Sequence, residues 1–238
     1  MNSPSVSRQQ RPFLFTMFAC AQFVILTAVA MHFYPGGTFA NSAAKGYSFF
    51  RNFFSDLGRT QTQSGASNTV SAILFVVALT LAGLGLALFF LAMPLLFRQA
   101  RPARLLSRLG SAAGLVSGLA FVGVAWAPVN LIGWLHRLFV QVAFLAFFLA
   151  VLCYIGAMLR TPAYPRCYAR VCGAFLLLLA VYLVLLFFGP ALLSANGLVI
   201  HATGQKIIVY AALAAAFILS DGARRLVAAD AARGPTVG

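Results

Sequence analysis

Six long apolar runs constrain the fold of this chain more than any other feature of its sequence. We place them at residues 12–34, 69–97, 109–127, 136–159, 170–188 and 198–220. Each comes close to or exceeds the roughly 20 residues that an α-helix needs to cross a bilayer. The runs are continuous rather than alternating, and helices satisfy their own backbone groups in lipid. The sequence therefore predicts an all-α, polytopic membrane bundle of six transmembrane helices, with residues 1–238 forming a single integral membrane domain.

The composition supports this prediction and excludes a common alternative. The chain is 62% hydrophobic and only 8% charged, whereas soluble domains carry about 25% charged residues. The net charge of +14 would suit a nucleic-acid-binding protein. However, most basic residues lie in short segments between apolar runs, where the rules of membrane topology place them. We therefore expect membrane lipid, and not nucleic acid, as a partner.

The distribution of Lys and Arg predicts the orientation of the bundle. Five basic residues lie on the side of the first, third and fifth loops, and twelve lie on the opposite side with both termini. Because positive charge accumulates in cytoplasmic segments, both termini are predicted to be cytoplasmic, in a bacterial inner membrane. The twelve are Arg8, Arg11, Arg98, Arg101, Arg104, Arg108, Arg160, Arg166, Arg170, Arg224, Arg225 and Arg233.

The first loop contains the most distinctive polar segment. When residues 48–59 are projected as a helix, the Phe residues and Leu57 fall on one arc, and the polar residues fall on the opposite arc. This pattern predicts an outward-facing amphipathic helix at the membrane interface. Its polar face would carry Arg51, Asn52, Asp56 and Arg59, and Asp56 is the single acidic residue before the C-terminal tail. A simple interfacial anchor is the alternative interpretation.

Polar residues of later spans are predicted to lie at the same depth. The third loop and the start of the fourth span contain Asn130, His136 and Arg137, and the sixth span begins with His201, Gln205 and Lys206. Intramembrane polar groups usually face the interior of a bundle or a wet cavity. For the cluster as a whole we predict a cavity. For Lys206 alone we predict that the side chain snorkels to the interface.

These residues suggest acid–base chemistry on an anionic ligand. We predict Asp56 paired with His136 or His201 as the acid–base group, and Ser55 as a candidate nucleophile whose base would be one of these histidines. Arg51, Arg59, Arg137 and Lys206 would hold an anion such as a lipid phosphate, and Asn52, Asn130 and Gln205 would orient it. A metal site built from Asp56 and two histidines lacks an HxxxH or HExxH spacing, so we assign no metal. The cofactor is left open.

Two short motifs resemble a known family. Asn52-Phe-Phe-Ser-Asp-Leu-Gly58 lies between the first two spans, and Pro128-x-Asn130 precedes His136. They resemble motifs of the bacterial six-span family catalogued as domain of unknown function 998, which often has Asp where this chain has Asn130. More distantly, the chain is similar to the Frag/DRAM/Sfk group, some members of which act in remodelling glycolipid anchors. The resemblance implies a role related to lipid by analogy.

The expected function is therefore recognition of an anionic or glycosylated lipid at the outer leaflet. The candidate catalytic residues also allow for chemical modification of this lipid. The alternative is a membrane sensor or assembly factor without enzymatic activity, which docks a protein partner through the outer amphipathic helix. The sequence leaves open whether the protein is an enzyme, and it leaves the oligomeric state open.

Overall fold

The computed structural model describes residues 4–98, 100–194 and 196–232, so Arg233 of the basic set lies outside the described residues. Six long helices and two short 3-10 helices account for most of the described chain. The elements are α1 (Pro4–His32), η1 (Phe54–Gly58), α2 (Thr69–Ala92), η2 (Met93–Leu96), α3 (Arg101–Trp126), α4 (Gly133–Leu159), α5 (Arg166–Phe188) and α6 (Gly197–Ala232).

All six long helices are long and apolar enough to cross a membrane, which confirms the predicted all-α bundle of six spans. Turn residues explain where several of them stop. Pro35 and Gly36 follow α1, and Gly189 and Pro190 follow α5, where proline lacks the N–H that another helical turn would need. The third span is longer than predicted, because the arginine-rich segment from Arg101 onward is already helical. The sixth also continues beyond its predicted end to Ala232.

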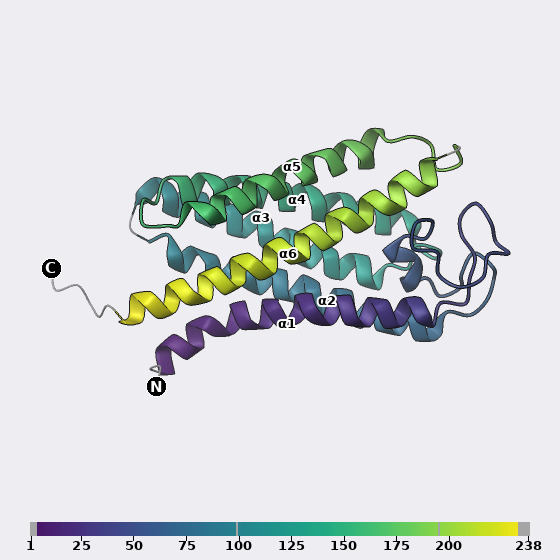
Figure 1. The fold of residues 1–238 in the computed structure, drawn as a ribbon, viewed down its shortest axis with the longest axis horizontal. Helices are drawn as coiled ribbons and strands as arrows, with labels where there is room; N and C mark the ends of the chain where they lie inside the picture. Colours follow the sequence, from purple (N-terminus) through teal and green to yellow (C-terminus); the bar gives the residue numbers. More distant parts are fainter. Residues whose placement is uncertain (1–3, 99, 195, 233–238) are drawn as a thin grey trace.

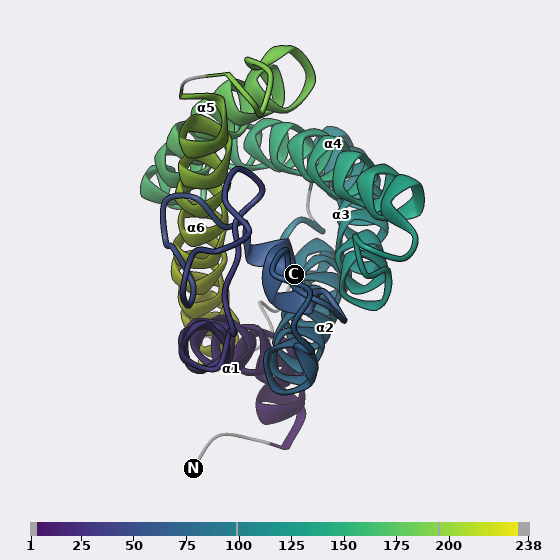
Figure 2. The same cartoon turned by 90° about the vertical axis from the view of Figure 1, so that its right-hand side faces the viewer.

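The helices form a closed ring in sequence order. Each helix packs against the next one, and α6 returns to pack against α1 (Figure 2). The start of α1 and the end of α6 lie at one end of the bundle, which we call the terminal end, and the long first loop covers the other, which we call the first-loop end (Figure 1). The short helix η1 contacts α1, α2, α3 and α6. It therefore closes the ring at the first-loop end.

Hydrogen bonds and close backbone contacts hold neighbouring helices together. The amide of Gln22 in α1 donates to the carbonyl oxygen of Ala78 in α2 at 2.9 Å, and the Ser117 hydroxyl in α3 donates to that of Ala143 in α4 at 2.9 Å. Helices α2 and α3 meet at Gly83 and Gly118, where a Cβ on either residue would lie 2.6 Å from the carbonyl oxygen of the other. Packing in lipid depends on such small residues and interhelical polar contacts.

The predicted amphipathic helix over residues 48–59 is wrong in extent and in the direction of its faces. Only Phe54–Gly58 are helical, as a 3-10 helix, and turns and bends precede them. Asn52 and Asp56 are buried, whereas Phe49 and Phe50 are exposed. The physical reason is that the Asn52 and Asp56 side chains bind backbone groups of the loop itself, which competes with a regular helix.

Candidate functional site

Lys206 of α6 is the buried link between the last helix and the first loop. Its side chain is 2% exposed, so the prediction that it snorkels to the interface is wrong. Its ammonium donates to the backbone carbonyl of Asn52. The rings of Tyr47, Phe49 and Phe54 lie 5.1–5.5 Å from the Lys206 nitrogen, within the range of cation–π attraction. Because this cation is already bound by the loop, it serves to fix the loop to α6.

Asp56 is directed into the loop and not toward a histidine. Its Oδ2 accepts hydrogen bonds from the Phe53 backbone N–H at 2.8 Å and from the Asn52 amide at 3.2 Å. Asn52 therefore lies between the two buried charges, because its carbonyl binds Lys206 and its amide binds Asp56. The predicted pairing of Asp56 with His136 or His201 does not occur among the described hydrogen bonds, because both histidines bind backbone carbonyls elsewhere.

The pKa of Asp56 predicts a pH dependence of stability. Burial raises this pKa above the ordinary 3.8, while the hydrogen bonds from Phe53 and Asn52 oppose the rise. A carboxyl group whose pKa is higher in the folded state binds more protons there, so stability should fall as pH rises from about 4 through the raised value. We expect the unfolding temperature in detergent to show this fall for the wild type, and Asp56→Asn to reduce it. Equal slopes for the two proteins between pH 4 and 8 would contradict this prediction.

Other polar side chains fasten the rest of the first loop. The Asn68 amide donates to the carbonyls of Leu57 and Arg59, both at 2.9 Å. Asn130, from the loop before α4, accepts from the Thr60 backbone N–H at 3.1 Å and donates to the Thr60 hydroxyl at 2.8 Å. Asn130 therefore orients the first loop in this structure, because it links this loop to the loop before α4.

The predicted cationic residues do not converge on one point. Arg51 and Arg137 are exposed, and Arg59 is partly exposed and donates to the Gln61 carbonyl at 3.1 Å. Of the four predicted anion-binding cations, only Lys206 is buried. The arginines thus form part of the surface at the first-loop end, separate from the Lys206 link.

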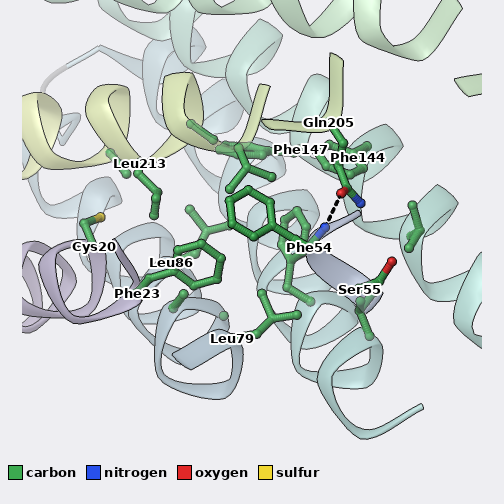
Figure 3. Close-up of a pocket in the computed structure, with 18 of the residues that line it drawn as sticks. Cys20, Phe23, Phe54, Ser55, Leu79, Leu86, Phe144, Phe147, Gln205 and Leu213 are labelled. Carbon is green, nitrogen blue, oxygen red and sulfur yellow. Dashed lines mark hydrogen bonds between the residues drawn. The ribbon is translucent and has the colours of Figure 1, made fainter. Parts of the chain in front are cut away.

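A long apolar cavity lies inside the ring below η1 (Figure 3). Its lining comes from α1, α2, α3, α4, α6 and η1, and it encloses about 100 Å³, several times the roughly 10–15 Å³ that one water needs. On α4 it extends from His136 to Phe147, and on α6 from Gln205 to Ala216. Eleven residues of helix rise about 16 Å. The length of the cavity therefore matches the depth of one leaflet, about 15 Å.

Ser55, His136 and Gln205 give the cavity a polar end. These three predicted site residues line it at the first-loop end, whereas Asp56 and His201 do not line it. The Gln205 Oε1 accepts from the Phe54 N–H at 2.8 Å, and Gln205 and Ser55 lie at the end of the pocket away from Cys20 (Figure 3). The cavity wall beyond them is apolar apart from Thr16 and Cys20, and the Thr16 hydroxyl already donates to Gly85.

The histidines have different surroundings. His136 is buried, and its Nδ1 lies 2.7 Å from the Ala127 carbonyl oxygen. A carbonyl only accepts, so Nδ1 carries the hydrogen, and the neutral ring presents the lone pair of Nε2. His201 instead binds the Pro190 carbonyl through Nε2 at 2.9 Å, and His32 is exposed. Within the described residues, no group of three or more His, Cys, Asp or Glu side chains is placed to hold a metal ion.

The sequence reasoning missed Asn68 and the whole apolar wall of the cavity. Asn68 stands directly before α2, and an Asn at that position normally signals a helix cap. Here its side chain donates to the loop instead. Apolar residues that line a cavity carry the same sequence signal as residues that face lipid. Comparison with known proteins found no matching family model, no matching curated protein and no matching solved structure.

Proposed function

We propose that this protein binds a lipid by one of its hydrocarbon chains, with the chain in the cavity and the polar part of the lipid at the first-loop end. The observation that carries the proposal is the cavity itself, which is apolar for about 16 Å along the bundle and has polar groups at one end. Ligand sites are typically of this kind, with apolar walls and a few convergent polar groups.

The orientation of the site follows from the distribution of basic residues. With both termini in the cytoplasm of a bacterial inner membrane, the first-loop end faces outward and the cavity lies at the depth of the outer leaflet. Arg51 and Arg137 are exposed at this end and would be available to the head group of an anionic or glycosylated lipid. The distant similarity to the Frag/DRAM/Sfk group, some members of which act in remodelling glycolipid anchors, agrees with such a role by analogy.

Chemical modification of the lipid would depend on Ser55 and His136, because these are the predicted catalytic residues that line the cavity. Asp56 would then support the loop that carries Ser55. The alternative, a sensor or assembly factor that docks a protein, is favoured by one observation. Phe49 and Phe50 are 40% and 56% exposed beside the predicted interface, where a protein partner would contact them.

A cavity-filling substitution tests lipid binding. The photoreactive probes are a fatty alcohol and a lysophosphatidic acid, each with a mid-chain diazirine, and they are applied to the purified protein. We expect at least one of them to label residues of the cavity wall. Ala212→Phe should reduce that labelling about tenfold, because Ala212 lines the cavity and the new ring would occupy the space of the chain. Peptide mapping by mass spectrometry locates the label.

Ala214→Phe is the matched control, since Ala214 is exposed on the same helix and does not line the cavity. It should leave labelling of the cavity wall unchanged. If neither probe labels the cavity wall, or if both variants reduce labelling equally, the proposal fails. The protein-docking alternative would then be the better explanation of the outward surface.

A further inference from the structure

Three unpaired polar groups at the end of the cavity define the chemistry of a ligand more narrowly than lipid binding does. They are the Ser55 hydroxyl, the Nε2 of His136 and the amide nitrogen of Gln205, and none of them has a hydrogen-bond partner within the described part of the chain. His136 is buried and Ser55 and Gln205 are half-buried, so a ligand or water at this end of the cavity would pair these groups. Their donor and acceptor roles therefore describe what they would bind.

Two of these roles are fixed by the protein. The Phe54 N–H can only donate, so the atom of Gln205 that faces it at 2.8 Å must be the oxygen, and the NH₂ group remains as a free donor. The Ala127 carbonyl can only accept, so the Nδ1 of neutral His136 donates to it and Nε2 remains as a free acceptor. The Ser55 hydroxyl can serve in either role. The cavity is thus lined at this end by a residue with a free donor and a residue with a free acceptor.

Within the described residues, no Asp, Glu, Lys or Arg side chain lines this end of the cavity. The ammonium of Lys206 is turned toward the Asn52 carbonyl and the aromatic rings around it. Asp56 is turned toward Phe53 and Asn52. Neither residue lines the cavity, and neither do the predicted cations Arg51, Arg59 and Arg137. An anionic group at this depth would lose its hydration without gaining a cation, which is unfavourable.

From this arrangement we infer that the cavity selects a lipid whose buried polar end is uncharged and bears a hydroxyl group. The hydroxyl hydrogen is donated to His136, and its oxygen accepts from Gln205. The inference rests on the proposed lipid-binding function and names its ligand class. Of the two lipid classes expected from the sequence, it favours the hydroxyl-rich glycosylated one over the anionic one. A long-chain alcohol is the minimal form of such a ligand.

A competition series tests the inference directly on the purified full-length protein at pH 8. The photoreactive probe is whichever one labels the cavity wall, and the competitors share one chain length: the alcohol, its methyl ether, the carboxylate and the trimethylammonium compound. The alcohol should compete about ten times better than the methyl ether, because the ether leaves the His136 acceptor unpaired. The two charged compounds should compete more weakly than the alcohol.

His136→Phe should reduce the alcohol to the level of the methyl ether and leave the ether unchanged. His201→Phe is the matched control and should preserve the tenfold preference, since His201 does not line the cavity. Equal competition by the alcohol and the ether in the wild type would overturn the inference, and so would stronger competition by the carboxylate. In both cases the proposed function would stand. Absence of labelling by either probe would instead contradict the proposed function itself.

Discussion

Replacing Lys206 by methionine should release the first loop and destabilise the protein by about 3 kcal/mol. Methionine has a similar length and keeps much of the packing, but it removes the hydrogen bond to the Asn52 carbonyl and the attraction to three aromatic rings. Hydrogen bonds to charged groups contribute about 1.5–3 kcal/mol, and a desolvated cation–π contact adds up to about 2 kcal/mol. The loss of lysine desolvation offsets part of this.

Unfolding in detergent measures the effect on stability, and limited trypsin digestion measures the release of the loop. Lys45 and Arg51 are exposed in the first loop, so cleavage there should become faster in Lys206→Met. Lys45→Met is the matched control and should change stability by less than about 0.5 kcal/mol. Unchanged stability and cleavage rate at Arg51 in Lys206→Met would show that the ammonium does not hold the loop.

The two buried charges on either side of Asn52 should also be coupled. Removing Lys206 leaves the Asp56 carboxylate without a nearby buried cation, so the double variant Lys206→Met/Asp56→Asn should be less destabilised than the sum of the two single variants. A double-mutant cycle isolates this interaction, because it subtracts the effects that each substitution has alone.

Adding one methyl group at Gly118 should destabilise the bundle by about 3 kcal/mol. A Cβ at this position would lie 2.6 Å from the Gly83 carbonyl oxygen and 2.8 Å from the Ala87 nitrogen. Both obstacles are backbone atoms of α2, so no side chain can rotate away and the two helices must separate. Overpacking in a core typically costs about 1–3 kcal/mol, and the upper end applies where the backbone must move.

The folded fraction in detergent, measured by size exclusion and thermal unfolding, reports this change. Gly173→Ala is the matched control, because a Cβ on Gly173 of α5 meets nothing within 4 Å. It should be neutral or slightly stabilising, since alanine favours helix by about 0.5–1 kcal/mol over glycine. If Gly118→Ala were as stable as Gly173→Ala, the close approach of α2 and α3 would be refuted.

The sequence predicts the spans well because one physical requirement, hydrocarbon thickness, acts on every helix separately. It predicts the first loop poorly because the side chains of Asn52 and Asp56 can bind either water or backbone groups. Which of these they bind depends on the helices that surround the loop. The helical projection assumed a regular helix with its polar face outward. The structure buries both side chains instead and exposes Phe49 and Phe50.

The sequence also predicts only part of the candidate site, because it does not show how the side chains are packed. Its depth in the membrane can be read from the chain, and His136, Gln205 and Ser55 do line one cavity. The direction of each side chain depends on how neighbouring helices pack. Lys206 and Gln205 are adjacent in sequence, yet one binds the loop carbonyl of Asn52 and the other lines the cavity. The direction of each of these two side chains is set by the packing of the helices in the ring, which the sequence does not show.

The link between α6 and the first loop has a consequence for biogenesis. Lys206 and Asn52 are 154 residues apart, and Gln205 and Phe54 are 151 apart. At about 5–20 residues per second, the ribosome needs roughly eight to thirty seconds to synthesise the chain between the two partners of each contact. During that interval Asn52 and Asp56 are already part of the nascent chain, but the sixth helix that binds their loop has not yet been synthesised. A chain that stops before α6 would keep this unfinished surface, on which membrane proteases and chaperones could act.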